Sequence, residues 1–321
     1  MQDSGKLETA LFFSAFPYRR RFLHFIKEHN KNITISNEPW NVKQNIQLLK
    51  YFYNKNQINY AISKTQRYLK NQKNFHFNQI ILWNEPEYSY LLKQIYDPPI
   101  VLFIKSSNGK MLNFNEYDSI SIVGTRNPFP VSLLATDRVV ELFSIFKNSD
   151  ELVKQIGKIH QTQLKLFREN LRKNQKMIAT VSGFARGIDY RVHKSSIFFN
   201  VPTIAILGSG IDFVSPKKHL KLFLEAVSNH QEFYLVSEFF PSYKAGKYTF
   251  PLRNRIITGL SQYLFVMQAG EKSGALISTD YALQENRDIY CFDHPFFDNL
   301  IHNDGNKKLI EEGANVLKIE V

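Results

Sequence analysis

Cysteine is almost absent from this chain of 321 residues, which contains Cys291 alone. A single thiol cannot form an intrachain disulfide, so the sequence excludes the disulfide-rich secreted class and fits a reducing compartment. Because Cys291 lies in the apolar run 289–292, we expect it to be a buried structural thiol and not a nucleophile.

Long apolar runs are missing as well. No run approaches the ~20 residues that a membrane-spanning helix needs. Asp3 and Glu8 precede only a short apolar patch at 11–16, which is not the pattern of a secretory signal. We therefore expect a cytoplasmic protein that does not enter a membrane.

The common nucleotide-binding loops are also missing. A dinucleotide-binding loop requires G-x-G-x-x-G after the first strand, but here only Gly124 is present and Pro128 follows. The segment Gly208–Gly210 lacks the third glycine, and no Walker lysine loop occurs. Use of NAD or ATP is therefore disfavoured, and we expect no cofactor.

Catalytic constellations are scarce. Asp189 and His193 stand four residues apart in a segment of helical spacing and could bind a metal or relay a proton. No third ligand shows a suitable spacing, so we prefer a local hydrogen-bonded pair and expect no metal site. Glu238 follows the fourth expected strand as a base or, more simply, as a carboxylate partner of Arg253 or Arg255.

Positive charge is in excess, with 41 Lys and Arg against 29 Asp and Glu and a net charge of +12. Residues 1–115 hold 16 basic and 7 acidic side chains, which leaves 25 and 22 in the remainder. The excess favours a polyanionic partner such as nucleic acid. A general bias toward Lys, Asn, Ile, Phe and Tyr explains it equally well, so charge alone does not decide.

The first 80 residues show helical spacing of apolar side chains in the segments 18–26, 42–49 and 58–69. The basic cluster Arg19–Arg21 is either a phosphate contact or a solvated helix face. We expect a small helical N-terminal domain over residues 1–85, followed by a connector at 86–118 that includes a strand-like run at 100–104.

From Ser119 onward, short β-branched runs alternate with helical segments, which predicts an α/β domain over 119–321 with a doubly wound, mostly parallel sheet. The long segment 131–176 predicts two helices with a break near 148–150, where Ser149 or Asp150 caps the second. The expected strands are 119–123, 177–181, 203–207, 233–236, 263–267, 288–292 and 315–319.

Small and basic residues follow these strands, at the edge where the loops of a doubly wound sheet meet. Backbone N–H groups at helix starts attract anions, and the arginines at 126, 186, 253 and 255 add full charges. The sequence therefore predicts an anion site. Phe184, in the turn 182–189, either stacks on a base or packs under its own loop. The candidate residues are Gly124, Thr125, Arg126, Ser182, Gly183, Phe184, Arg186, Gly208, Ser209, Lys217, Arg253, Asn254, Arg255, Ser273 and Gly274.

The same motifs resemble the DprA/Smf family of DNA-processing proteins over roughly residues 88–317. The resemblance implies an extended Rossmann fold that binds single-stranded DNA, usually as a homodimer, and delivers the strand to a RecA-type recombinase in natural transformation. It also implies DNA contacts at Arg126, the 182–186 turn and the 253–255 segment. In one departure, Gln268-Ala269 stands where the family commonly has Glu-Ala.

The leading hypothesis is a non-enzymatic binder of single-stranded DNA. The alternative is a nucleotide-processing enzyme similar to the LOG-type phosphoribohydrolases, which carry a Pro-Gly-Gly-x-Gly-Thr loop where this chain has 268–274. A nucleotide-sensing module without turnover is a third possibility.

Overall fold

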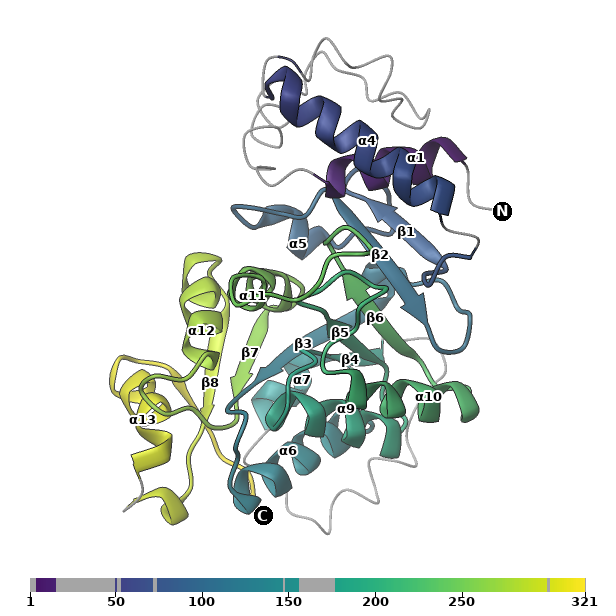
Figure 1. Ribbon diagram of the computed structural model, residues 1–321. Coiled ribbons are helices and arrows are strands. Elements are labelled where there is room, and N and C mark those ends of the chain that lie inside the picture. The colour runs from purple at the N-terminus through teal and green to yellow at the C-terminus, as the bar shows by residue number, and fades with distance from the viewer. Residues whose placement is uncertain are drawn as a thin grey trace.

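A nine-stranded sheet runs through the molecule in the order β1-β2-β6-β5-β4-β3-β7-β8-β9 (Figure 1). The computed structural model describes residues 4–15, 50, 53–71, 74–146, 148–155, 177–298 and 301–320. The strands are β1 (Gln79–Leu82), β2 (Val101–Ser106), β3 (Tyr117–Val123), β4 (Met177–Ser182), β5 (Thr203–Ile206), β6 (Phe233–Ser237), β7 (Tyr263–Val266), β8 (Asp288–Phe292) and β9 (Asn315–Leu317).

Every pairing from β6 to β9 is parallel, while β2 pairs antiparallel with both β1 and β6. All seven strands expected after residue 119 are present, so the predicted Rossmann-like, mostly parallel sheet is confirmed. The chain starts this region at β3, adds β4, β5 and β6 on one side, and then crosses to β7, β8 and β9 on the other. The strand order therefore reverses between β3 and β7, which is where such sheets bind ligands.

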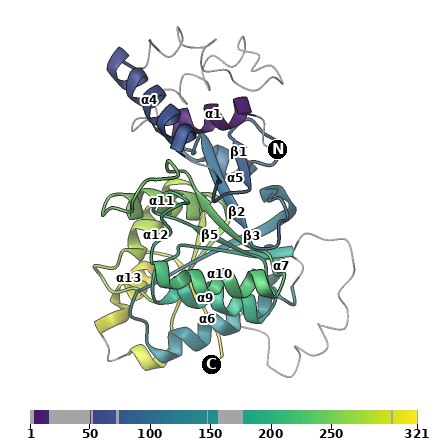
Figure 2. The ribbon, with the colours of Figure 1, turned by 45° about the vertical axis from the view of Figure 1, so that its right-hand side comes forward.

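Helices cover both faces of the sheet (Figure 2). On one face lie α6 (Pro130–Phe143), α9 (Ile188–Phe198) and α10 (Leu220–Ser228), and on the other lie α5 (Tyr90–Gln94), α11 (Thr249–Gly259), α12 (Ala275–Gln284) and α13 (Asp304–Glu311). Strands buried on both faces explain the continuous apolar runs of the sequence. The short 3₁₀ helices are η1 (Phe114–Glu116), η3 (Lys217–His219), η4 (Pro295–Phe297) and η5 (Ile301–Asn303).

The N-terminal region differs from the expectation of helices alone, because residues 79–82 form β1 and pair with β2 of the main sheet. The run is only four residues long and lacks polar alternation, since all four side chains are buried. Helices α1 (Ser4–Ser14) and α4 (Lys55–Asn71) join β1, β2 and α10 in one apolar cluster. The expected helical segment 58–69 is part of α4, whereas 18–26, 42–49 and Arg19–Arg21 lie outside the described residues.

The predicted break in the segment 131–176 is confirmed, because α6 ends at Phe143 and α7 (Ser149–Gln155) begins after it. The cap differs from the prediction. Asn148 caps α7 by accepting a hydrogen bond from the Glu151 N–H at 2.7 Å, while the Ser149 hydroxyl donates to Asp118 at 2.8 Å. Residues 156–176 lie outside the described ranges.

Cys291 is fully buried on β8, as predicted, and burial raises the pKa of its thiol to about 12. A group with so high a pKa stays protonated and unreactive at neutral pH. In the part of the chain that the structure describes, no helix combines the length and apolarity needed to cross a bilayer.

Gln79 fixes the start of β1 to the loop that follows β2. Its side-chain amide donates to the Leu112 carbonyl at 2.8 Å and accepts from the Leu112 N–H at 2.7 Å, and all these groups are buried.

We predict that Gln79→Met lowers the free energy of unfolding by roughly 1–3 kcal/mol, because two buried backbone groups lose their partner. Urea denaturation measures this, with Gln284→Met on the exposed side of α12 as the control; equal stability of the two variants would show that this anchor is not needed.

Candidate nucleic-acid interface

A pocket of about 680 Å³ opens at the carboxyl ends of β3 and β7, where the strand order reverses. Its walls come from four places in the sequence: the loop after β3, the turn after β4, the segment from 245 into α11, and the start of α12. Seven of the candidate residues line it: Gly124, Thr125, Arg126, Arg253, Asn254, Ser273 and Gly274. Segments about 150 residues apart in the sequence therefore meet in one cavity.

Arg126 presents an exposed positive charge to this pocket. Its side chain is exposed, and its guanidinium carbon lies 5.8 Å from the centre of the Phe250 ring, a cation–π arrangement. Burial raises the pKa of Asp189, and the positive charge of Arg126 partly opposes that rise. Burial lowers the pKa of Arg253, and the charge of Arg126 adds to that lowering. Arg126 and Arg253 thus face the same small volume, and an anion that enters it meets two guanidinium groups.

Arg253 is buried and held from several sides. Its Nε donates to Asn254 at 2.9 Å, its Nη1 donates to the Ile206 carbonyl at the end of β5, and its Nη2 lies 3.7 Å from the Asp189 carboxylate. Burial lowers the pKa of Arg253, an effect that Asp189 partly offsets. The side chain forms the inner wall of the pocket. It joins α11 to the end of β5 and to the start of α9.

The turn 182–189 is fastened to the loop after β3. The Ser182 hydroxyl donates to the Ile122 carbonyl at 2.7 Å, and the Ile188 N–H donates to the Thr125 carbonyl at 3.1 Å. Gly183 has no room for a side chain, since a Cβ there would collide with the Arg253 guanidinium. Gly187 adopts φ +82°, a conformation that favours glycine. These contacts explain why both glycines are needed in this turn.

Phe184 is buried, so base stacking is not available to it in this structure. Its ring packs edge-on against His219 at 5.5 Å and Phe233 at 6.1 Å. The interpretation that it packs under its own loop is therefore the correct one. Arg186 is exposed on the same turn. Burial lowers the pKa of His219, and the positive charge of Arg186 lowers it further. Its charge thus lies toward η3 and is not part of the pocket wall.

Arg255 does not reach the pocket either. Its Nη1 and Nη2 donate to the two Glu238 oxygens at 2.5 and 2.7 Å, and its Nε donates to the Asp97 carbonyl at 2.8 Å. Burial alone would lower the pKa of Arg255, but the Glu238 carboxylate outweighs it and the pKa is raised. Residues two positions apart in an α-helix point in directions that differ by about 200°. Arg253 and Arg255 therefore point to opposite sides of α11. The expected carboxylate pairing of Glu238 is confirmed.

The loop after β5 supports the site from behind. Gly208 lies against the Phe250 ring, whose other neighbour is Arg126, and the Ser209 carbonyl accepts a hydrogen bond from Ser237 at 2.6 Å. Ser209 is buried, while Lys217 is exposed on η3. None of these three candidates lines the pocket itself.

The pocket lining includes a basic and an aromatic residue that were not among the candidates from the sequence. Lys247 and Phe250, which precede and begin α11, both line it. The available signal was the charge of the segment before α11, because residues 239–248 include two lysines and no acidic residue.

His193 is a structural residue. Its Nε2 donates to the Gly183 carbonyl at 2.6 Å and its Nδ1 lies 2.7 Å from the Thr203 hydroxyl, so the preferred pairing with Asp189 is wrong. Asp189 instead accepts from the Ala185 N–H at 3.3 Å. Within the described ranges, no group of three or more His, Cys, Asp or Glu side chains is placed to hold a metal ion.

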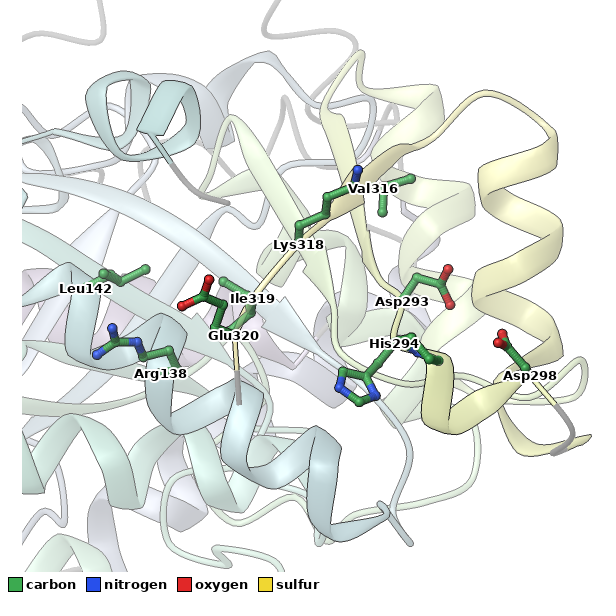
Figure 3. Close-up of a pocket in the computed structure, with 10 residues that line it drawn as sticks. Arg138, Leu142, Asp293, His294, Asp298, Val316, Lys318, Ile319 and Glu320 are labelled. Atoms are coloured by element: carbon green, nitrogen blue, oxygen red, sulfur yellow. The ribbon is translucent and has the colours of Figure 1, made fainter. Parts of the chain in front are cut away.

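A separate pocket of about 450 Å³ lies beside α6, where the chain leaves β8 and β9, and we call it the carboxyl-terminal pocket (Figure 3). Arg138 and Lys318 line it together with three carboxylates, Asp293, Asp298 and Glu320. Because acidic groups outnumber basic ones there, this pocket suits a polyanion poorly compared with the one between β3 and β7.

Comparison with known proteins gives the same assignment as the motifs. The family model of DNA recombination-mediator protein A matches residues 79–146 and 155–320, which is most of the chain. The chain belongs to this family. Its resemblance to the DprA/Smf proteins, seen in the motifs, is confirmed.

Family members of similar sequence include DNA processing protein DprA of Bacillus subtilis, 34% identical over 263 residues, which cover 82% of this chain and 75% of that protein. DprA of Streptococcus pneumoniae is 30% identical over 72% of this chain and 67% of its own length. An X-ray structure of S. pneumoniae DprA aligns with a TM-score of 0.71 over 98% of this chain and 95% of that chain, at 23% identity. A structure of DNA processing protein A from Helicobacter pylori, whose single-stranded DNA binding mode is described, aligns at a TM-score of 0.56 and 21% identity over 76% and 93% of the chains.

Gln268, which follows β7, connects three segments beside the pocket. The buried Gln268 side chain accepts hydrogen bonds from the Phe129 N–H and the Ser132 hydroxyl, both at 2.9 Å, and donates to the His302 carbonyl at 3.3 Å. A glutamate has no N–H to donate to His302. Glutamine therefore ties α6, β7 and η5 together beside the pocket.

For the Arg255–Glu238 pair we predict that Arg255→Met lowers the free energy of unfolding by roughly 3–5 kcal/mol, because it removes the guanidinium that neutralises the buried Glu238 carboxylate. The double variant Arg255→Met/Glu238→Leu should recover a large part of this loss. Urea denaturation of the wild type, both single variants and the double variant gives the coupling. Additive single-variant losses would contradict a coupled structural pair.

For His193 we predict a neutral ring at pH 5.5, because burial lowers its pKa to about 4. The unfolded chain takes up a proton near pH 6.5, so stability from this residue is present above that pH and falls by up to about 3 kcal/mol as the pH approaches 4. Ring ¹H–¹⁵N spectra during a pH titration report the protonation directly, with the exposed His230 as an internal comparison. A midpoint for His193 near 6.5 would contradict the burial argument.

Proposed function

We propose that this protein binds single-stranded DNA without catalysing its conversion, with the DNA phosphates held in the pocket between β3 and β7. The observation that carries the proposal is the exposed Arg126 guanidinium, which shares an open cavity with Arg253, Lys247 and the start of α12. The first turn of a helix offers backbone N–H groups and the positive end of the helix dipole to an anion. Together, the basic side chains and these N–H groups suit the phosphates of a DNA backbone.

The family supports the same ligand. Its relatives are named DNA processing proteins, and the H. pylori member is described with a single-stranded DNA binding mode. The acidic residue at the pocket, Asp189, is already occupied by Arg253 and the Ala185 N–H, so it leaves the pocket positive. Phosphate contacts carry little sequence information, and we therefore expect sequence-tolerant binding.

We further propose the wider role that family membership suggests: action in the cytoplasm as a homodimer that passes the strand to a RecA-type recombinase during natural transformation. The support is the family assignment, whose description is a recombination mediator. Co-purification of the recombinase with the DNA-bound protein, and light scattering of the free protein, test the recombinase and dimer separately.

We predict that Arg126→Ala weakens binding of a fluorescent oligothymidylate by tenfold or more at moderate salt and reduces the slope of log K against log salt by about 0.7. Arg186→Ala should weaken binding as well, because this arginine is exposed on the adjoining turn. Fluorescence anisotropy at several salt concentrations measures both effects.

The matched control is Lys318→Ala, which removes a positive charge beside the other pocket and should leave affinity unchanged. Unchanged affinity in both arginine variants would exclude the pocket as the DNA site. Release of free base from nucleoside monophosphates by the wild type would contradict the non-enzymatic role.

A further inference from the structure

A second basic and aromatic surface lies on α4 and the loops that face it. It consists of Tyr60, Lys64 and Arg67 on α4, Phe213 after β5 and Tyr243 after β6, and we call it the α4 surface. A pocket of about 600 Å³ separates the two sides. None of its residues belongs to the pocket between β3 and β7.

All the charged residues of α4 are basic. Its 17 residues include Lys55, Lys64, Arg67 and Lys70 and no acidic residue. Tyr60, Lys64 and Arg67 are spaced by four and three residues, so they share one face of the helix, and all three line the pocket. This face points toward the loops of the α/β domain and not into bulk solvent alone.

Exposed aromatic rings concentrate on this surface. Tyr60 is 58% exposed, Phe213 44% and Tyr243 44%, although the Tyr243 ring also stacks on Phe239 at 5.6 Å. A lysine lies over each ring: Lys64 is 5.6 Å from Tyr60 and 6.0 Å from Tyr243, and Lys244 is 5.7 Å from Phe213. Rings flanked by cations are the arrangement with which proteins hold the bases and phosphates of single strands.

The packing of α4 against the α/β domain is carried by other residues. Tyr68 is buried and donates to Asp212 at 2.8 Å, and His76 contacts the second Asp212 oxygen at 3.1 Å. These bonds engage the acidic group of this pocket. Tyr60 and Arg67 lie outside this packing, so they are available to a ligand.

The loop 239–248 connects the α4 surface to the pocket between β3 and β7. Its residues Phe240 and Ser242 line the pocket beside α4, and Ala245, Gly246 and Lys247 line the pocket between β3 and β7. The loop holds two lysines and no acidic residue, and Tyr248, which is 79% exposed, lies beneath Lys247 at 5.5 Å. A basic and aromatic track therefore leads from one pocket to the other.

We propose that the α4 surface is a second subsite for single-stranded DNA, where a strand held between β3 and β7 continues across the loop 239–248 and stacks its bases on Tyr60 and Tyr243. The inference rests on the proposed function of the first pocket. A single strand fits better than a duplex because the exposed rings need unpaired bases, whose faces a duplex hides.

The test compares two oligothymidylates, one of about six nucleotides, which fills only the first pocket, and one of about twenty, which reaches both. The double variant Tyr60→Ala/Arg67→Ala should weaken binding of the long strand by about tenfold and leave the short strand unchanged. Arg126→Ala should weaken both. Lys55→Ala removes a charge from the opposite side of α4 and should change neither.

The outcomes separate the two proposals. Equal affinity of wild type and double variant for the long strand, with both strands weakened by Arg126→Ala, overturns the second subsite and leaves the first intact. Absence of binding to either strand by the wild type overturns both. An equal loss of duplex binding in the double variant overturns the stacking role. The stacking role is also overturned if the double variant binds the long strand as the wild type does and loses only the binding of an acidic protein.

Crosslinking gives an independent readout that does not depend on the stability of a variant. A long strand with 5-iododeoxyuridine at each position in turn should crosslink on irradiation to Tyr60 or Tyr243 when the label lies far from the end held in the first pocket, and mass spectrometry identifies the residue. Crosslinks confined to the first pocket at every label position would overturn the proposal.

Discussion

The buried guanidinium of Arg253 is the contact on which the proposed DNA site depends. It joins the end of β5, through the Ile206 carbonyl, to Asp189 at the start of α9 and to its own helix α11. A side chain at Gly183 would displace it, and that glycine begins the turn that hydrogen-bonds to the loop after β3. A charge so deeply buried is stable only when its donors are satisfied. Three loops are thereby fixed in one geometry, and the exposed Arg126 can face a pocket of defined shape.

The two arginines of the Arg-Asn-Arg motif show how one helix divides its charges. Arg253 faces the pocket, and Arg255 faces Glu238 and the Asp97 carbonyl between α5 and β2. The first arginine shapes the ligand site, and the second attaches α11 to the segment that leads into the antiparallel edge of the sheet. A motif of this kind therefore combines a binding role with a folding role.

Much of the fold could be predicted from the sequence, because strands buried on both faces leave continuous β-branched runs and their order along the chain places the loops at one edge. Gly124, Arg126, Arg253 and Ser273 were accordingly found in one pocket. The direction of individual side chains could not be predicted: Phe184 turns inward and Arg255 turns to Glu238 because of tertiary partners far away in the sequence. The four-residue strand β1 was missed for the same reason, since only its partner β2 distinguishes it from a helix turn.

The most direct test of the central claim is hydrogen–deuterium exchange of the wild-type protein with and without a saturating oligothymidylate. Binding at the point where the strand order reverses predicts slower exchange in 124–127, 245–254 and 273–276, with no change in 293–298 or 316–320 around the carboxyl-terminal pocket. Protection confined to the carboxyl-terminal pocket, or none at the loop after β3, would contradict the account.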